Sequence, residues 1–267
     1  VPLVIASEQS IAGAIQAPKI FVFRTLSAIL VVSLIFSFSS NPWLTEALRR
    51  PVADTGRLAL RNLRSHPVGL AVAAALGANL VSYLLSPVRS VSWGGVDPGF
   101  DGYGLLNILC FLTFFLALAT HLLGADQLRR LLWVSTIASV VIGIYGFAQY
   151  LGIDVVQGAG GHPGRLTLTF GNAIFAAAYL LMGVPLTLVL WETLRTRMGT
   201  LAHVGVGVAL ITFPLFGIAY SLSRGAIVSL VFALAVYVGL GAYALGRRSI
   251  RRTLVVIGVS MTLVVLL

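Results

Sequence analysis

The chain turns at Tyr220-Ser221-Leu222-Ser223-Arg224-Gly225-Ala226-Ile227-Val228-Ser229-Leu230, which places one arginine between two long apolar runs, 201–220 and 225–246. Each run is long enough for a helix that crosses a lipid bilayer. A charged side chain that faces lipid is costly, so an arginine at such a turn normally has a partner or a task. The stretch predicts two membrane-spanning helices joined by a tight turn that carries Arg224.

The composition indicates that membrane-spanning helices make up most of the chain. Its 267 residues are 58% hydrophobic and only 10% charged, and the mean hydropathy is +0.98. Soluble domains carry about a quarter charged residues, so a polytopic membrane protein is predicted. We expect one all-α transmembrane helical domain over residues 1–267. The net charge of +10 does not indicate a nucleic-acid partner, because the basic residues form short clusters between apolar runs without interleaved aromatic residues.

Further apolar runs of spanning length are expected at 20–38, 67–86, 103–123, 131–151 and 168–191. Shorter helical pieces at each end, 1–17 and 253–267, bring the expected total to about nine helical segments. Pro18 is expected to break the first piece, and Pro185 and Pro214 to kink their helices. The last piece would be about 22 Å long, short of a bilayer core of about 30 Å. We therefore expect a part of a longer protein, incomplete at both ends.

Basic residues alternate between the connecting segments. Thirteen of the eighteen lie on 41–65, 124–130, 192–200 and 247–252, whereas the opposite set, 87–102, 152–167 and 221–225, holds only Arg89, Arg165 and Arg224. The positive-inside rule predicts that the first set is cytoplasmic and that the second faces outward. Lys19 and Arg24 fall on the outer side against this rule. Segment 41–65 is expected to hold a short amphipathic helix at the cytoplasmic surface.

Arg224 is the candidate for chemistry. Ser223 can cap a helix that starts near Gly225, which places Arg224 in its first turn. Free N–H groups and a partial positive charge at a helix N-terminus attract an anion, and the planar guanidinium suits a phosphate or diphosphate. The alternative is that Arg224 extends to the membrane surface and only sets topology.

A second arginine has similar surroundings. Arg165 precedes a helix entered through Phe170-Gly171-Asn172, which Thr167 or Thr169 can cap. Gly171 would let a ligand or a helix approach closely. Arg165 can equally be an interfacial arginine, and Arg89 with Trp93 can be an interfacial anchor.

The sequence contains no motif for a nucleotide site, a zinc site or a catalytic triad. No phosphate-binding glycine loop, zinc-ligand spacing or Ser-His-Asp arrangement is present, so neither metal nor cofactor is expected. Asp97, Asp101 and His162 are expected to be solvated loop residues. His203 is expected to be structural, and Cys110, the single cysteine, a small apolar side chain.

Four stretches also form a familiar series. They are Ser86-Pro87 with Ser92-Trp93-Gly94, Tyr145-Gly146-Phe147 within 144–154, Arg165 followed by Thr169-Phe170-Gly171-Asn172 and Phe175-Ala176-Ala177, and Ser223-Arg224-Gly225-Ala226. Together, across roughly residues 65–235, they resemble the O-antigen ligase and polymerase superfamily of bacterial membrane glycosyltransferases. The first stretch is similar to a subgroup whose longer members often end in tetratricopeptide repeats.

The resemblance implies an all-helical, GT-C-like, metal-independent and inverting transferase of the bacterial cytoplasmic membrane. It would move a glycan from undecaprenyl diphosphate to a lipid or glycan acceptor at the periplasmic face. A ligase uses the lipid A core in lipopolysaccharide biosynthesis, and a polymerase uses another lipid-linked unit. Arg224 would be the catalytic residue and would stabilise the leaving diphosphate. The remaining expected substrate contacts are Arg165, Gly171, Asn172, Ser223 and Arg89.

Two departures from the family pattern keep an alternative open. Ile174 stands where the family often has a polar asparagine, in Gly171-Asn172-Ala173-Ile174-Phe175. The family's large outer loop, with a second arginine and a histidine, would follow residue 267, so at most half a site is expected. The alternative is a non-catalytic subunit that scaffolds or binds lipid in a larger membrane complex. A transporter is disfavoured because only Glu8 places an acidic side chain well inside an apolar run.

Overall fold

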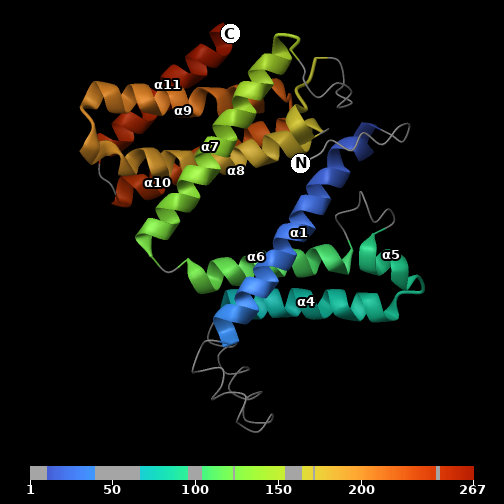
Figure 1. Ribbon diagram of the computed structural model, residues 1–267. Coiled ribbons are helices and arrows are strands. Elements are labelled where there is room, and N and C mark those ends of the chain that lie inside the picture. Colours follow the sequence, from blue (N-terminus) through green and yellow to red (C-terminus); the bar gives the residue numbers. More distant parts are fainter. Residues whose placement is uncertain are drawn as a thin grey trace. The chain divides into compact units, whose positions relative to one another are not determined.

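The computed structural model describes residues 11–39, 67–95, 104–122, 124–153, 164–170, 172–244 and 247–267 (Figure 1). Every regular element in these ranges is helical. Seven of the described helices are long and apolar enough to cross a membrane. The prediction of an all-α, multi-pass membrane protein is therefore confirmed for this part of the chain. Segment 41–65, with its expected amphipathic helix, lies outside the described residues.

The chain forms two compact units. The N-terminal unit is Gln16–Leu123, and the C-terminal unit is Gly124–Leu267 with Val1–Ile15. The helices of the first are α1 (Ile11–Ser39) from Gln16 on, α4 (Pro67–Leu85), α5 (Arg89–Gly94) and α6 (Leu105–His121). Those of the second are α7 (Ala125–Tyr150), the 3-10 turn η1 (Leu168–Phe170), α8 (Ala173–Thr193), the 3-10 turn η2 (Arg195–Arg197), α9 (Thr200–Tyr220), α10 (Arg224–Ala244) and α11 (Arg247–Leu266).

In the N-terminal unit, α1 and α6 run parallel. Arg24 Nε donates to Asn107 Oδ1 at 3.0 Å near one end, and Ser37 Oγ lies 3.4 Å from His121 Nε2 near the other. The Phe23 ring stacks on that of Phe114 between them. Arg24 therefore has a partner at the buried Asn107. This hydrogen bond gives the Arg24 side chain a structural role between α1 and α6.

Two expectations for this unit are wrong, and a third holds only in part. Pro18 lies inside the continuous helix α1 and does not end it. Membrane helices tolerate proline because neighbouring groups can satisfy the freed carbonyl. Arg89 begins the short helix α5 within a segment expected to be a loop. The run at 103–123 yields α6, whose 17 residues make it shorter than the helices that qualify as spans.

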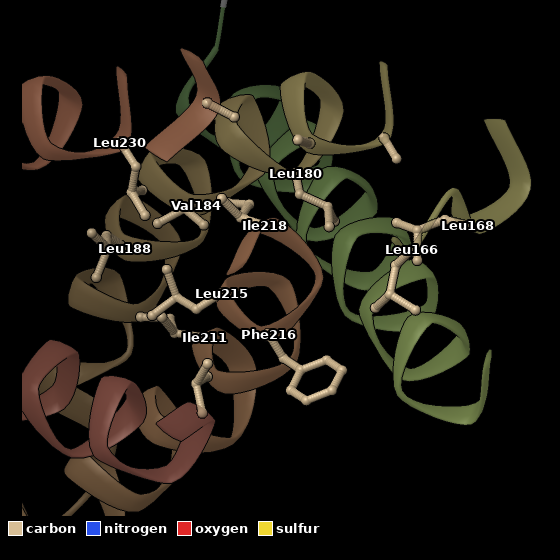
Figure 2. Close-up of a cluster of buried hydrophobic side chains, with 14 of the residues drawn as sticks. Leu166, Leu168, Leu180, Val184, Leu188, Ile211, Leu215, Phe216, Ile218 and Leu230 are labelled. Atoms are coloured by element: carbon tan, nitrogen blue, oxygen red, sulfur yellow. The ribbon is translucent and has the colours of Figure 1, made fainter. Parts of the chain in front are cut away.

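The core of the C-terminal unit lies between α8 and α9, an antiparallel pair joined through η2. Buried side chains recur every three or four residues on both helices, which is the period of one helix face. Figure 2 shows Leu180, Val184 and Leu188 of α8 beside Ile211, Leu215 and Ile218 of α9. The helix α7 packs against both, α11 packs on α9, and α10 packs on α8. Large apolar side chains on the outer faces remain exposed, as lipid contact requires.

Glycines set the close helix crossings of this unit. A Cβ on Gly143 of α7 would lie 2.6 Å from the Phe213 backbone carbon of α9, so this crossing has no room for a side chain. A Cβ on Gly207 of α9 would lie 2.6 Å from Trp191 Nε1 of α8. Trp191 Nε1 donates to the His203 carbonyl at 2.7 Å, and His203 Nε2 donates to the Trp191 carbonyl at 2.9 Å. The structural role expected for His203 is confirmed.

The C-terminal unit has two ends. We call the end with the last turn of α7, residues 164–170, the start of α8 and the α9–α10 turn the site end. There the Leu166 N–H donates to the Tyr220 carbonyl at 3.1 Å, and the Leu168 N–H donates to Gln149 Oε1 at 3.0 Å. We call the opposite end, with the starts of α7, α9 and α11 and with η2, the arginine end. Arg252 Nη2 lies 3.4 Å from Thr200 Oγ1 there.

The segments predicted to share a membrane side therefore share an end of this unit. The boundaries differ, because α7 and α11 begin at Ala125 and Arg247 and so include arginines expected in loops. Pro185 and Pro214 lie inside the continuous helices α8 and α9.

Candidate functional site

The site end is organised by segment 164–170, which lies against the turn between α9 and α10. Gly164 has φ +84°, a conformation that glycine adopts without strain. The chain then pairs with the end of α9 through the Leu166 N–H and the Tyr220 carbonyl. Leu168 and Leu222 have φ angles of 53° and 51°, in the left-handed region that side chains rarely adopt. The segment that carries Arg165 and the turn before Arg224 thus each contain one strained leucine.

Arg165 is bound to the turn that precedes Arg224. Its Nε donates to the Ser221 carbonyl at 2.9 Å, and the side chain is half-buried. Its two terminal nitrogens have no protein partner among the described residues. The guanidinium group is therefore held in place at one edge, while its other N–H groups remain available to a ligand.

Arg224 is the first residue of α10, so it stands at the helix terminus where backbone N–H groups lack partners. Its side chain is exposed and makes no hydrogen bond or ion pair in the described part of the chain. The backbone links it closely to Arg165, because Ser221, which accepts from Arg165, lies only three residues earlier. Two guanidinium groups thus share the site end.

Ser223 does not cap α10 in the way expected. Its carbonyl accepts from the Ile227 N–H at 3.1 Å and so belongs to the first turn of the helix. Its buried hydroxyl makes no hydrogen bond to that turn among the described residues. Ser223 therefore occupies the N-cap position directly before Arg224, where its carbonyl accepts the first helical hydrogen bond but the expected side-chain cap is not formed.

Asn172 caps α8. Its Oδ1 accepts from the Ile174 N–H at 2.9 Å, so the expectation that Thr167 or Thr169 provides the cap is wrong. Thr167 precedes the 3-10 turn η1 and Thr169 lies within it, so neither residue stands directly before α8. Ile174 is 55% exposed, so an apolar side chain stands beside the cap. Gly171 lies outside the described residues, as do Asp97, Asp101 and His162.

The sequence interpretation missed an aromatic cluster at this end. The Tyr220 ring stacks on Phe216 with centroids 4.3 Å apart, and Tyr150 lies 4.7 Å from Tyr220 and 5.4 Å from Phe216. Both tyrosines are the last residues of their helices, α7 and α9. Their shared position at the ends of two apolar runs is the feature of the sequence that could have indicated the cluster. The cluster therefore places two tyrosine side chains at the same end of the unit as the two arginines.

Arg89, the remaining candidate, is the exposed first residue of α5 and belongs to the N-terminal unit. The apolar helices define the class of the protein as a multi-pass helical membrane protein, with Arg165 and Arg224 at the site end of its C-terminal unit. No protein-family model, curated protein or solved structure matches the chain. No group of three or more potential metal-ligating side chains lies together in the described ranges.

Proposed function

We propose that the protein is an O-antigen-ligase-like glycosyltransferase of the bacterial cytoplasmic membrane with a GT-C-like fold. It would move a glycan from a polyprenyl diphosphate to a lipid or glycan acceptor at the outer face. The observation that carries the proposal is that Arg165 is held at the Ser221 carbonyl, three residues before Arg224, so that both arginines lie at one end of the C-terminal unit. Both side chains keep guanidinium nitrogens without a protein partner in the described ranges.

A diphosphate fits the charges of this end. Arg224 and the first N–H groups of α10 offer donors to one phosphate, and the free edge of Arg165 offers donors to another oxygen. No acidic residue lies among 164–170 or 220–230 to compete for the arginines. Tyr150 and Tyr220 supply aromatic faces of the kind that pack against the prenyl chain or the sugar.

The proposed reaction is a displacement at the anomeric carbon. An acceptor hydroxyl attacks that carbon on the face opposite the diphosphate, the bond from the carbon to the diphosphate oxygen breaks, and the hydroxyl proton passes to solvent. The diphosphate departs with the bonding electrons, and the attack from the opposite face inverts the configuration at the anomeric carbon. Arg224 and Arg165 would stabilise the negative charge that grows on the leaving oxygen, which is charge stabilisation by fixed donors.

A second candidate is a non-catalytic subunit that binds lipid in a larger membrane complex. Two residues expected to contact substrate have structural partners, because Arg165 Nε binds the Ser221 carbonyl and Asn172 Oδ1 caps α8. The exposed Ile174 adds an apolar surface where a polar contact was expected. These observations favour lipid contact over chemistry for the start of α8.

The test is glycan transfer in cells that express Arg224→Ala or Arg224→Lys. Both variants should lose transfer, by roughly a hundredfold or more, because lysine cannot supply the planar two-donor fork. Arg251→Ala removes an equally exposed arginine at the arginine end and should transfer normally. Immunoblots of membranes would confirm equal insertion. Normal transfer by Arg224→Ala would exclude the catalytic role, whereas loss in Arg251→Ala as well would indicate a general charge effect.

A further inference from the structure

The arginine end contains a hollow that the proposed function does not use. Its volume is about 310 Å³, and its lining residues come from the start of α7, the end of α8 and η2: Arg129, Arg130, Trp133, Thr193, Leu194 and Arg197. Ligand pockets in proteins begin at about 300 Å³, which is enough for a small polar headgroup. The hollow lies on the face of α7 that meets the α8–α9 connection, so two separate segments contribute its charges.

Its positive charge is only partly neutralised. Arg129 Nη2 lies 3.0 Å from Asp126 Oδ1, and outside the hollow Arg195 Nη1 lies 3.0 Å from Glu192 Oε1. Arg130 and Arg197 are exposed and have no hydrogen bond or ion pair within the described residues. The nearby carboxylates are thus engaged by other arginines. Two unpaired guanidinium groups, one from α7 and one from η2, therefore remain among the residues that line the hollow.

Trp133, which also lines the hollow, lies further along α7 than Arg129 and Arg130. It follows Arg129 and Arg130 by four and three residues, so its Cα is about 5 to 6 Å further along α7 toward the apolar part of the helix. Its side chain is 37% exposed, and Val134 and Ile137 beyond it are more than half exposed. Tryptophan is enriched at the boundary between headgroups and acyl chains. Along α7 from its start, arginine side chains therefore come first, the Trp133 indole second, and exposed aliphatic side chains third.

We propose that this hollow binds the phosphate of an anionic membrane phospholipid such as phosphatidylglycerol. The phosphate would lie between Arg130 and Arg197, the glycerol region against Trp133, and an acyl chain along the exposed apolar side of α7. Basic pockets between helices bind anionic headgroups in this way, and the guanidinium fork matches the phosphodiester oxygens. The order of cations and apolar groups favours a lipid over free phosphate, which needs only the cations. This site is independent of the one proposed at Arg224.

The test is native mass spectrometry of the purified protein, titrated in neutral detergent with phosphatidylglycerol, phosphatidylcholine or inorganic phosphate. One phosphatidylglycerol should stay bound to the wild-type protein, and phosphatidylcholine should not. Arg130→Gln and Arg197→Gln should each weaken binding about fivefold, and the double variant about 25-fold, since each arginine near a charged membrane surface contributes similarly. Arg251→Gln makes the same charge change at the same end outside the hollow, and should bind as the wild type does.

A second readout reports on the indole. Brominated phosphatidylglycerol should quench the emission of the wild-type protein more than that of Trp133→Phe. Wild-type lipid binding by both Arg130→Gln and Arg197→Gln would overturn the proposal. Equal weakening in Arg251→Gln would overturn it too, because binding would then follow net charge alone. Displacement of the lipid by inorganic phosphate at equal concentration would reject the lipid as the ligand. Circular dichroism would verify that every variant remains folded.

Discussion

At the residue scale, the turn that carries Arg224 holds a strained leucine. Leu222 has φ 51° and a side chain that is 56% exposed, so little packing offsets the backbone cost. A left-handed conformation costs a residue with a side chain about 1–2 kcal/mol. Strain of this kind persists where the surrounding structure imposes it, and it gathers at functional sites. Here it lies between Ser221, which accepts from Arg165, and Ser223, which precedes Arg224.

Replacing the two strained leucines should separate strain from packing. Leu222→Gly should leave the free energy of unfolding unchanged or raise it by up to about 1 kcal/mol, because glycine adopts positive φ freely. Leu168→Gly relieves the same strain but removes a side chain that is 0% exposed, so it should lower the free energy by about 2–5 kcal/mol. Unfolding in detergent followed by circular dichroism measures both. A marked loss in Leu222→Gly would show that its side chain, not its backbone, secures the turn.

At the element scale, helix packing depends on where glycine allows backbones to meet. Gly143 brings α7 against the backbone of α9 at Phe213, whereas a Cβ added to Gly205 on α9 would meet nothing within 4 Å. Gly143→Ala should lower the free energy of unfolding by about 1–3 kcal/mol, because two helices must separate to admit a methyl group. Gly205→Ala should be neutral or stabilise by up to about 1 kcal/mol through helix propensity. Equal thermal stability of the two variants would contradict the described crossing.

Hydropathy located some helices well and others poorly, for physical reasons. Run 201–220 matches α9 almost to the residue, because the bilayer demands an apolar stretch of that length. Hydropathy predicts later starts for α7 and α11, because the first two turns of both helices carry arginines, which are typical of loops. The α8 cap was misassigned because η1 delays the helix to Ala173. That delay depends on the contact between Leu168 and Gln149, nineteen residues apart in sequence.

At the scale of the whole molecule, the C-terminal unit separates two kinds of positive charge. The site end holds Arg165 and Arg224 with an aromatic cluster, and the arginine end holds a mixed group of arginines and carboxylates. The loop-charge pattern predicted which segments gather at each end. It did not predict that Ser221 links Arg165 to the turn of Arg224, because a contact across 56 residues has no local signal.

The most direct test of the central claim is the binding of undecaprenyl diphosphate and undecaprenyl phosphate to the purified protein. The wild-type protein should bind the diphosphate more tightly, and Arg224→Ala should weaken that binding by about ten- to a hundredfold, the range for charge-assisted hydrogen bonds. The Arg224 side chain has no hydrogen bond or ion pair to lose among the described residues, so the variant should fold normally, and Arg251→Ala serves as the matched control. Diphosphate binding of wild-type strength in Arg224→Ala would contradict the assignment of this site.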